Sequence, residues 1–147
     1  MKSNTFLNNK LYIFFFLTYF LVGIFIVQDF GISVDEEFHR FSGFYWLSYI
    51  LDFTHFNDLK MEVTIKLSNI SGNTLPNPKN YPFYGVTFDL PLAFIETIFQ
   101  INESRNYYLL RHYANFSVFF ISSIFFLLIL KNRFKDKNLI ILGALLY

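Results

Sequence analysis

Ionisable side chains gather most densely at residues 33–40, where the chain runs Ser-Val-Asp-Glu-Glu-Phe-His-Arg. This cluster begins six positions after a long apolar run ends at Val27. A carboxylate held there can act as a general base on an acceptor hydroxyl, or help to hold a divalent cation. We therefore take Asp35 as the candidate catalytic or cation-associated acid, with Glu36 beside it.

Ser33 and Glu36 have the spacing of a capping box, which predicts that a helix starts here. Asp35 and Glu36 would lie in its first turn, where the helix dipole favours negative charge. The side chains would then have fixed directions. The alternative is that both acids only cap the helix and are otherwise solvated.

His39 follows Asp35 by four residues and Glu36 by three, so the three side chains would share a helical face. Such a histidine more commonly pairs with a neighbouring acid than binds a metal. We regard His39 as a candidate substrate-binding residue.

Two further candidate contacts to substrate lie later in the chain. Arg111 is near the outer end of a second apolar segment, where an arginine is costly unless it snorkels or pairs, and a phosphate would be a good partner. Tyr84 belongs to an aromatic turn at residues 81–85 that could cover a substrate cleft. The alternatives are a snorkelling cation for Arg111 and an interface anchor for Tyr84.

The composition indicates a membrane protein. The 147 residues are 54% hydrophobic, and the apolar residues occur in continuous segments rather than at the spacing of an amphipathic helix. The net charge is only +1 and no basic tract is present, so nucleic acid is not an expected partner. The absence of cysteine excludes disulfides and cysteine-based metal sites.

The order of apolar and charged segments predicts a multi-pass topology. We expect a first span at 11–27, an outer loop at 28–104, a second span at 107–130, a cytoplasmic loop at 131–138 and the start of a third span at 139–147. A cleaved signal peptide is the less favoured alternative for 11–27, because no small-residue cleavage site follows it. Cations flank the first span on one side and the second on the other, which predicts a cytoplasmic N-terminus and an extracytoplasmic loop.

Three elements are expected within the outer loop. A helix after Asp35 would have an apolar face at 38, 41, 45 and 49, with Glu37 and Arg40 off that face, and would lie in the headgroup region. Met61–Ser68 alternates apolar and polar residues, which predicts a strand. A second surface-lying helix would start at Asp89 as its cap, with an apolar face formed by Leu92, Ile95, Ile98 and Phe99.

The order of the expected elements is familiar. An anchor helix is followed by an acid pair just outside it, then by aromatic surface helices and by a second span that carries an arginine. The chain resembles the N-terminal part of C-type integral-membrane glycosyltransferases, in the branch of dolichyl-phosphate-mannose protein mannosyltransferases and lipid A aminoarabinose transferases. Those enzymes carry an Asp-Glu pair in the first extracytoplasmic loop, where Asp35 and Glu36 stand. The resemblance implies that Asp35 is the catalytic or cation-associated acid and that Arg111 belongs to the shared pattern.

The resemblance implies an all-α integral membrane fold in a bacterial inner membrane. It also implies transfer of a sugar from a polyprenyl-phosphate donor, with membrane lipid around the protein and an unspecified acceptor. Such enzymes have more spans than 147 residues can hold, so we expect the chain to be the front part of a longer enzyme and inactive alone. The alternative is a small non-enzymatic membrane protein whose outer loop binds a partner chain. Transport is disfavoured, because neither span carries polar groups through its middle.

Overall fold

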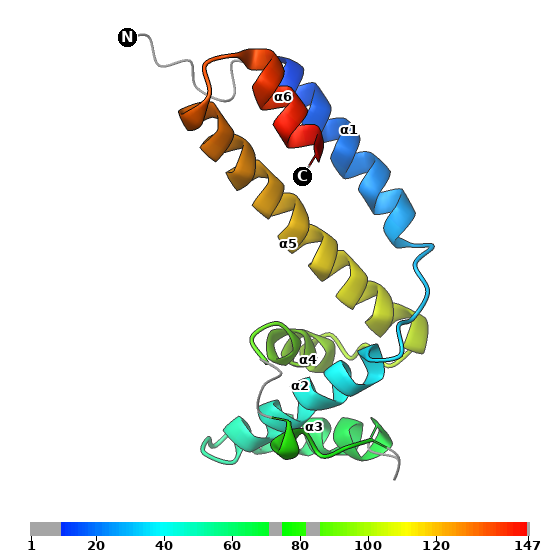
Figure 1. Ribbon diagram of the computed structural model, residues 1–147. Coiled ribbons are helices and arrows are strands. Elements are labelled where there is room, and N and C mark those ends of the chain that lie inside the picture. The colour runs from blue at the N-terminus through cyan, green and yellow to red at the C-terminus, as the bar shows by residue number, and fades with distance from the viewer. Residues whose placement is uncertain (1–9, 71–74, 82–85, 147) are drawn as a thin grey trace. The chain divides into compact units, whose positions relative to one another are not determined.

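The computed structural model describes residues 10–70, 75–81 and 86–146, and every regular element in this part of the chain is helical (Figure 1). This confirms the all-α expectation. The residues fall into two compact units. We call Met1–Phe30 with Arg111–Tyr147 the apolar unit, and Gly31–Leu110 the loop unit.

The apolar unit contains α1 (Lys10–Val27), most of α5 (Ser104–Arg133) and α6 (Lys137–Leu146). Its helices contact one another through large side chains, and the buried cluster comprises Tyr12, Phe16, Leu127, Leu130 and Ile140. Phe16 and Phe120 meet edge to face with ring centroids 5.9 Å apart. Many other apolar side chains of α1 and α5 remain exposed, including Phe14, Phe25 and Phe125.

Among the described residues, α5 alone is long and apolar enough to cross a bilayer. Its 30 residues would extend about 45 Å, against a hydrocarbon core of about 30 Å. The apolar stretch of α1, Tyr12–Val27, is shorter. One membrane-capable helix therefore agrees with the second expected span, while the multi-pass topology stays a prediction.

The loop unit is built on α2 (Glu36–Leu51), which packs against α3 (Asn57–Ile70), the short 3-10 helix η2 (Pro78–Asn80) and α4 (Asp89–Ile98). Figure 1 shows α3 and α4 beside α2. The apolar core of this unit consists of Phe41, Phe44, Leu47, Leu51, Val63, Ile70 and Ala93.

The predicted strand at Met61–Ser68 was wrong, because this segment lies inside α3. Leu59, Val63 and Leu67 recur every four residues and pack toward the core of the loop unit. The apolar residues that complete the alternation, Met61 and Ile65, are instead exposed on the other side of the helix. Two apolar faces on one helix therefore produced a pattern that resembles a strand.

The side of α2 that packs into the loop unit differs in part from the apolar face expected at 38, 41, 45 and 49. Phe41 is buried, but Tyr49 is 51% exposed, and Arg40, expected off that face, is only 9% exposed. The face that packs inward carries Arg40, Phe44, Leu47 and Leu51, at steps of four, three and four residues. The charged side chain of Arg40 is therefore buried on this face, near the amino-terminal end of α2.

The second loop helix begins at Asp89, and the side that packs inward shares only Leu92 with the expected apolar face. Phe88 occupies the cap position, and the Asp89 side chain is buried instead of capping the helix. The inward residues are Asp89, Leu92, Ala93, Glu96 and Thr97. Ile98 and Phe99 of the expected apolar face are 52% and 71% exposed.

Gly43 allows α2 and α4 to approach closely. A Cβ atom at this position would lie 2.5 Å from the backbone oxygen of Asp89 and 2.8 Å from its carbonyl carbon. Those atoms belong to the backbone, so they can move away only if the two helices separate.

We predict that Gly43→Ala destabilises the loop unit by about 1–3 kcal/mol, because overpacking at the crossing outweighs the better helix propensity of alanine. The measurement is denaturant unfolding in detergent, followed by the fluorescence of Trp46, the one tryptophan of the chain. Gly31→Ala is the control, since its Cβ would meet nothing within 4 Å. Equal stability of the two variants would contradict the close approach.

Candidate functional site

The acid pair stands at the amino-terminal end of α2. Asp35 is the cap residue, and its side chain is exposed and makes no capping hydrogen bond. Glu36 accepts a hydrogen bond from the backbone N–H of Ser33 at 3.2 Å, which is one half of the predicted capping box. The helix start is therefore confirmed. The Asp35 carboxylate stands at the positive end of the α2 dipole, toward solvent.

His39 pairs with an acid that is distant in the sequence. Its Nδ1 lies 3.1 Å from Oδ2 of Asp89, fifty residues along the chain at the start of α4. The Asp89 side chain is 7% exposed, whereas that of His39 is 37% exposed. A buried carboxylate thus fixes the orientation of a half-exposed imidazole one turn after Asp35.

The next residue, Arg40, forms the most buried polar contact in the loop unit. Its Nε donates to both carboxylate oxygens of Glu96 at 3.1 and 3.2 Å, and Nη2 donates to Oε1. The guanidinium carbon lies 3.6 Å from the ring centroid of Tyr107 in the first turn of α5. Glu96 is fully buried, so each charge depends on the other to offset its loss of water.

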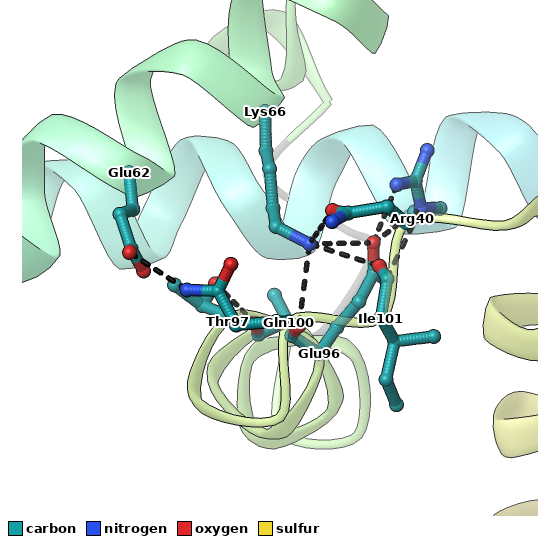
Figure 2. Close-up of polar contacts among 9 residues, drawn as sticks. Arg40, Glu62, Lys66, Glu96, Thr97, Gln100 and Ile101 are labelled. Carbon is teal, nitrogen blue, oxygen red and sulfur yellow. Dashed lines mark hydrogen bonds and ion pairs between the residues drawn. The ribbon is translucent and has the colours of Figure 1, made fainter.

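Lys66 of α3 closes the other side of this network (Figure 2). Its Nζ donates to the backbone oxygens of Glu96 and Ile101 at 3.2 and 2.9 Å and to Oδ1 of Asn102 at 3.0 Å, and it lies 3.9 Å from Oε1 of Glu96. All three ammonium protons therefore have acceptors at the carboxyl end of α4. This places a cation where the helix dipole favours one.

The carboxyl end of α4 is itself a Schellman turn. Ile101 N–H bonds to the oxygen of Glu96, Gln100 N–H bonds to that of Thr97, and Gln100 has a φ of 54°. The Gln100 amide donates to Oε1 of Glu62 at 2.7 Å, so α3 holds this turn through two side chains one helical turn apart. Several hydrogen bonds therefore hold the turn between α4 and α5 in place.

Burial lowers the pKa of Lys66 from its ordinary value of 10.5. The carboxylate of Glu96 opposes this effect, and the positive charge of Arg40 adds to it. Lys66 thus loses its proton more readily in the folded chain than in the unfolded chain.

The candidate residues do not all fall in one place. Asp35, Glu36 and His39 lie together on the first turns of α2 in the loop unit. Arg111 is buried in α5 and belongs to the apolar unit. Tyr84 lies outside the described residues.

The described residues do not form a ligand set for a divalent cation. Within residues 10–70, 75–81 and 86–146, no group of three or more His, Asp or Glu side chains is arranged to hold a metal ion. Asp35 remains a single candidate ligand, which does not fit the several oxygen ligands that calcium or magnesium takes.

The sequence alone did not identify the residues that hold α4 against α2 and α3, namely Arg40, Lys66, Asp89 and Glu96. One signal was present for Glu96. It is the one ionisable residue in the largely apolar stretch 90–99, and a lone acid in such a stretch needs a partner if it is buried. The identity of that partner was not visible, because Arg40 lies 56 residues earlier.

Comparison with known proteins gives no relative: no family model, no curated protein and no solved structure matches this chain.

We predict that Glu96→Gln lowers the free energy of unfolding by about 3–5 kcal/mol, because it leaves the Arg40 charge buried without a counter-charge. Asp52→Asn is the control, since it breaks an exposed pair with Lys60 (2.7 Å) and should cost less than about 1 kcal/mol. Denaturant unfolding followed by Trp46 fluorescence measures both. Equal losses would show that the pair at Glu96 has no special role.

The lowered pKa of Lys66 predicts a pH dependence of stability. Between the folded pKa and 10.5 the unfolded chain binds more protons, so the contribution of Lys66 to the unfolding free energy rises with pH, and below that window it is constant. The difference in unfolding free energy between wild type and Lys66→Met should therefore grow as pH approaches 10.5. Lys79→Met serves as the control, because Lys79 is exposed. A difference that shrinks with rising pH would contradict the assignment.

Proposed function

We propose that the chain is the N-terminal part of a membrane glycosyltransferase. The full enzyme would move a sugar from a polyprenyl-phosphate donor to an acceptor on the extracytoplasmic face, in a bacterial inner membrane. The observation that carries this proposal is the Asp35 carboxylate, exposed at the start of a helix that the buried Arg40–Glu96 ion pair and the His39–Asp89 contact hold in place. The resemblance of the element order to C-type glycosyltransferases supplies the reaction class.

The location of the acid favours a lipid-linked substrate. The loop unit includes the first turns of α5, the helix with the length and composition of a membrane span. An acid close to the amino-terminal end of a membrane-spanning helix would lie at the level of the lipid headgroups. A donor anchored in the membrane would present its phosphate and sugar at that level.

The chemistry assigned to the site is an inverting displacement at the anomeric carbon. The acceptor oxygen forms the new bond to this carbon while the bond to the phosphate oxygen breaks, and the phosphate leaves with the electron pair. The acceptor proton passes to the Asp35 carboxylate, which acts as the general base. Glu36 orients Asp35, and Arg111 is the candidate to stabilise the charge on the leaving phosphate.

His39 has a supporting role in this proposal. Its imidazole is half-exposed and oriented by the buried Asp89, so one ring edge is held in place beside the acid pair. Contact with the donor or the acceptor is the role we assign to it. Tyr84 is retained as a second contact on the basis of its aromatic turn.

A non-enzymatic membrane protein that binds a partner chain is the second candidate, and one observation favours it. Four aromatic rings contact one another in series along α2 and just beyond it, in the order Tyr45, Trp46, Tyr49 and Phe53. The centroid distances between successive rings are 5.4, 5.7 and 5.3 Å. The last two, Tyr49 and Phe53, are 51% and 76% exposed. Exposed aromatic residues of this kind are common in protein interfaces.

We predict that Asp35→Asn in the full-length protein lowers sugar transfer by at least about 100-fold, because the general base is lost while the helix start is kept. The assay is transfer from a polyprenyl-phosphate sugar in reconstituted vesicles, with membrane insertion checked by resistance to carbonate extraction. Asp58→Asn is the matched control, an exposed acid in the first turn of α3.

Two results would count against the enzyme. Transfer by Asp35→Asn at the wild-type rate would reduce the acid pair to a helix cap. Absence of transfer by the wild-type protein, together with capture of a partner chain that Tyr49→Ala and Phe53→Ala abolish, would favour the binding protein.

A further inference from the structure

Two neighbouring tyrosines at the start of α5 lie beside the amino-terminal part of α2. The guanidinium carbon of Arg40 lies 3.6 Å from the ring centroid of Tyr107. The rings of Tyr107 and Tyr108 are also in contact, with centroids 4.7 Å apart. Both tyrosines belong to Gly31–Leu110, so this contact lies within the loop unit.

The contact with Arg40 brings the start of α5 to the side of α2 that carries two carboxylates. Glu36 and Glu37 precede Arg40 by four and three residues, so the three side chains lie on one side of the helix. Both carboxylates interact electrostatically with the Tyr108 phenol, which places this phenol near them. Asp35 directly precedes Glu36. Tyr108 therefore reaches the acid pair from a second helix.

The Tyr108 hydroxyl is available to a ligand. The side chain is half-buried, and its hydroxyl has no hydrogen-bond partner within the part of the chain that the structure describes. A phenol both donates and accepts a hydrogen bond, which matches the hydroxyl of a sugar, and its ring offers an apolar surface to C–H groups. A phosphate fits this position less well, because the consecutive acids at 35–37 would repel its negative charge.

We infer that Tyr108 binds a hydroxyl group of the sugar that is transferred at Asp35. The phenol O–H donates to the oxygen of that hydroxyl, which orients the anomeric carbon toward the acceptor oxygen. Tyr108 is then a substrate-binding residue that recognises the sugar, and it takes no part in the proton transfer assigned to Asp35. This inference rests on the proposed glycosyl transfer and adds to it the group by which the sugar is recognised.

The test is Tyr108→Phe in the full-length protein, because this change removes the hydroxyl and keeps the ring. Transfer in reconstituted vesicles is measured with polyprenyl phosphate linked to glucose, galactose or mannose. The donor that wild type uses is then compared with analogues that each lack one sugar hydroxyl. Tyr107→Phe is the matched control, since it also removes a phenol hydroxyl and keeps the ring that covers Arg40.

With the intact donor, kcat/KM should fall about 10-fold in Tyr108→Phe and stay near the wild-type value in Tyr107→Phe. Wild type should lose a similar factor with one particular deoxy analogue, whereas Tyr108→Phe should use this analogue as well as the intact donor, because the hydrogen bond is already absent.

Three results would overturn the inference while the wild-type protein remains active. They are wild-type transfer by Tyr108→Phe, an equal loss in Tyr107→Phe, and a loss in Tyr108→Phe that multiplies with the loss from every analogue, as a purely structural role would give. Absence of wild-type transfer with all three sugars is a different outcome, because it contradicts the proposed function and removes this inference with it.

Discussion

The buried ion pair between Arg40 and Glu96 is the contact on which the loop unit depends. Removing two charges from water is costly, and here the cost is offset by three hydrogen bonds and by Tyr107 against the guanidinium. Lys66 adds a second cation from α3, so the single carboxylate of Glu96 joins three helices and the first turn of α5. Such a pair does not guarantee greater stability than an apolar core would give. Its value lies in specificity, because any other packing of α4 would leave a charge buried without a partner.

This arrangement determines how the acid pair is presented. His39 and Arg40 on α2 contact Asp89 and Glu96 on α4, and Gly43 lets the two backbones meet between those contacts. The first turns of α2 are therefore held from one side by the Arg40–Glu96 ion pair, the His39–Asp89 contact and a close crossing. Asp35 stands just before these contacts, exposed and directed by the helix. Both ionisable side chains of α4, Asp89 and Glu96, are used to hold α2.

What the sequence predicted well was local in origin. The start of α2 follows from Ser33 and Glu36, the start of α4 agrees with Pro91 in its first turn, and the apolar length of α5 is evident from composition. The failures involve contacts between distant segments. The partner of Glu96 lies 56 residues away, and no local pattern identifies it. Met61 and Ile65 mimicked a strand because α3 carries exposed apolar residues as well as buried ones. The burial of Asp89 and Glu96 on α4 was not predicted, because their partners lie on a distant segment.

The most direct test of this account is amide hydrogen exchange at residues 36–40, compared between wild type and Glu96→Gln in the same membrane mimetic. If the Arg40–Glu96 pair holds the acid-bearing start of α2, these amides should exchange much faster in the variant, together with the amides of α4. The apolar part of α5 should be unaffected, and it provides an internal reference. Unchanged protection at residues 36–40 would contradict the account, because the start of α2 would then be held by something other than the ion pair.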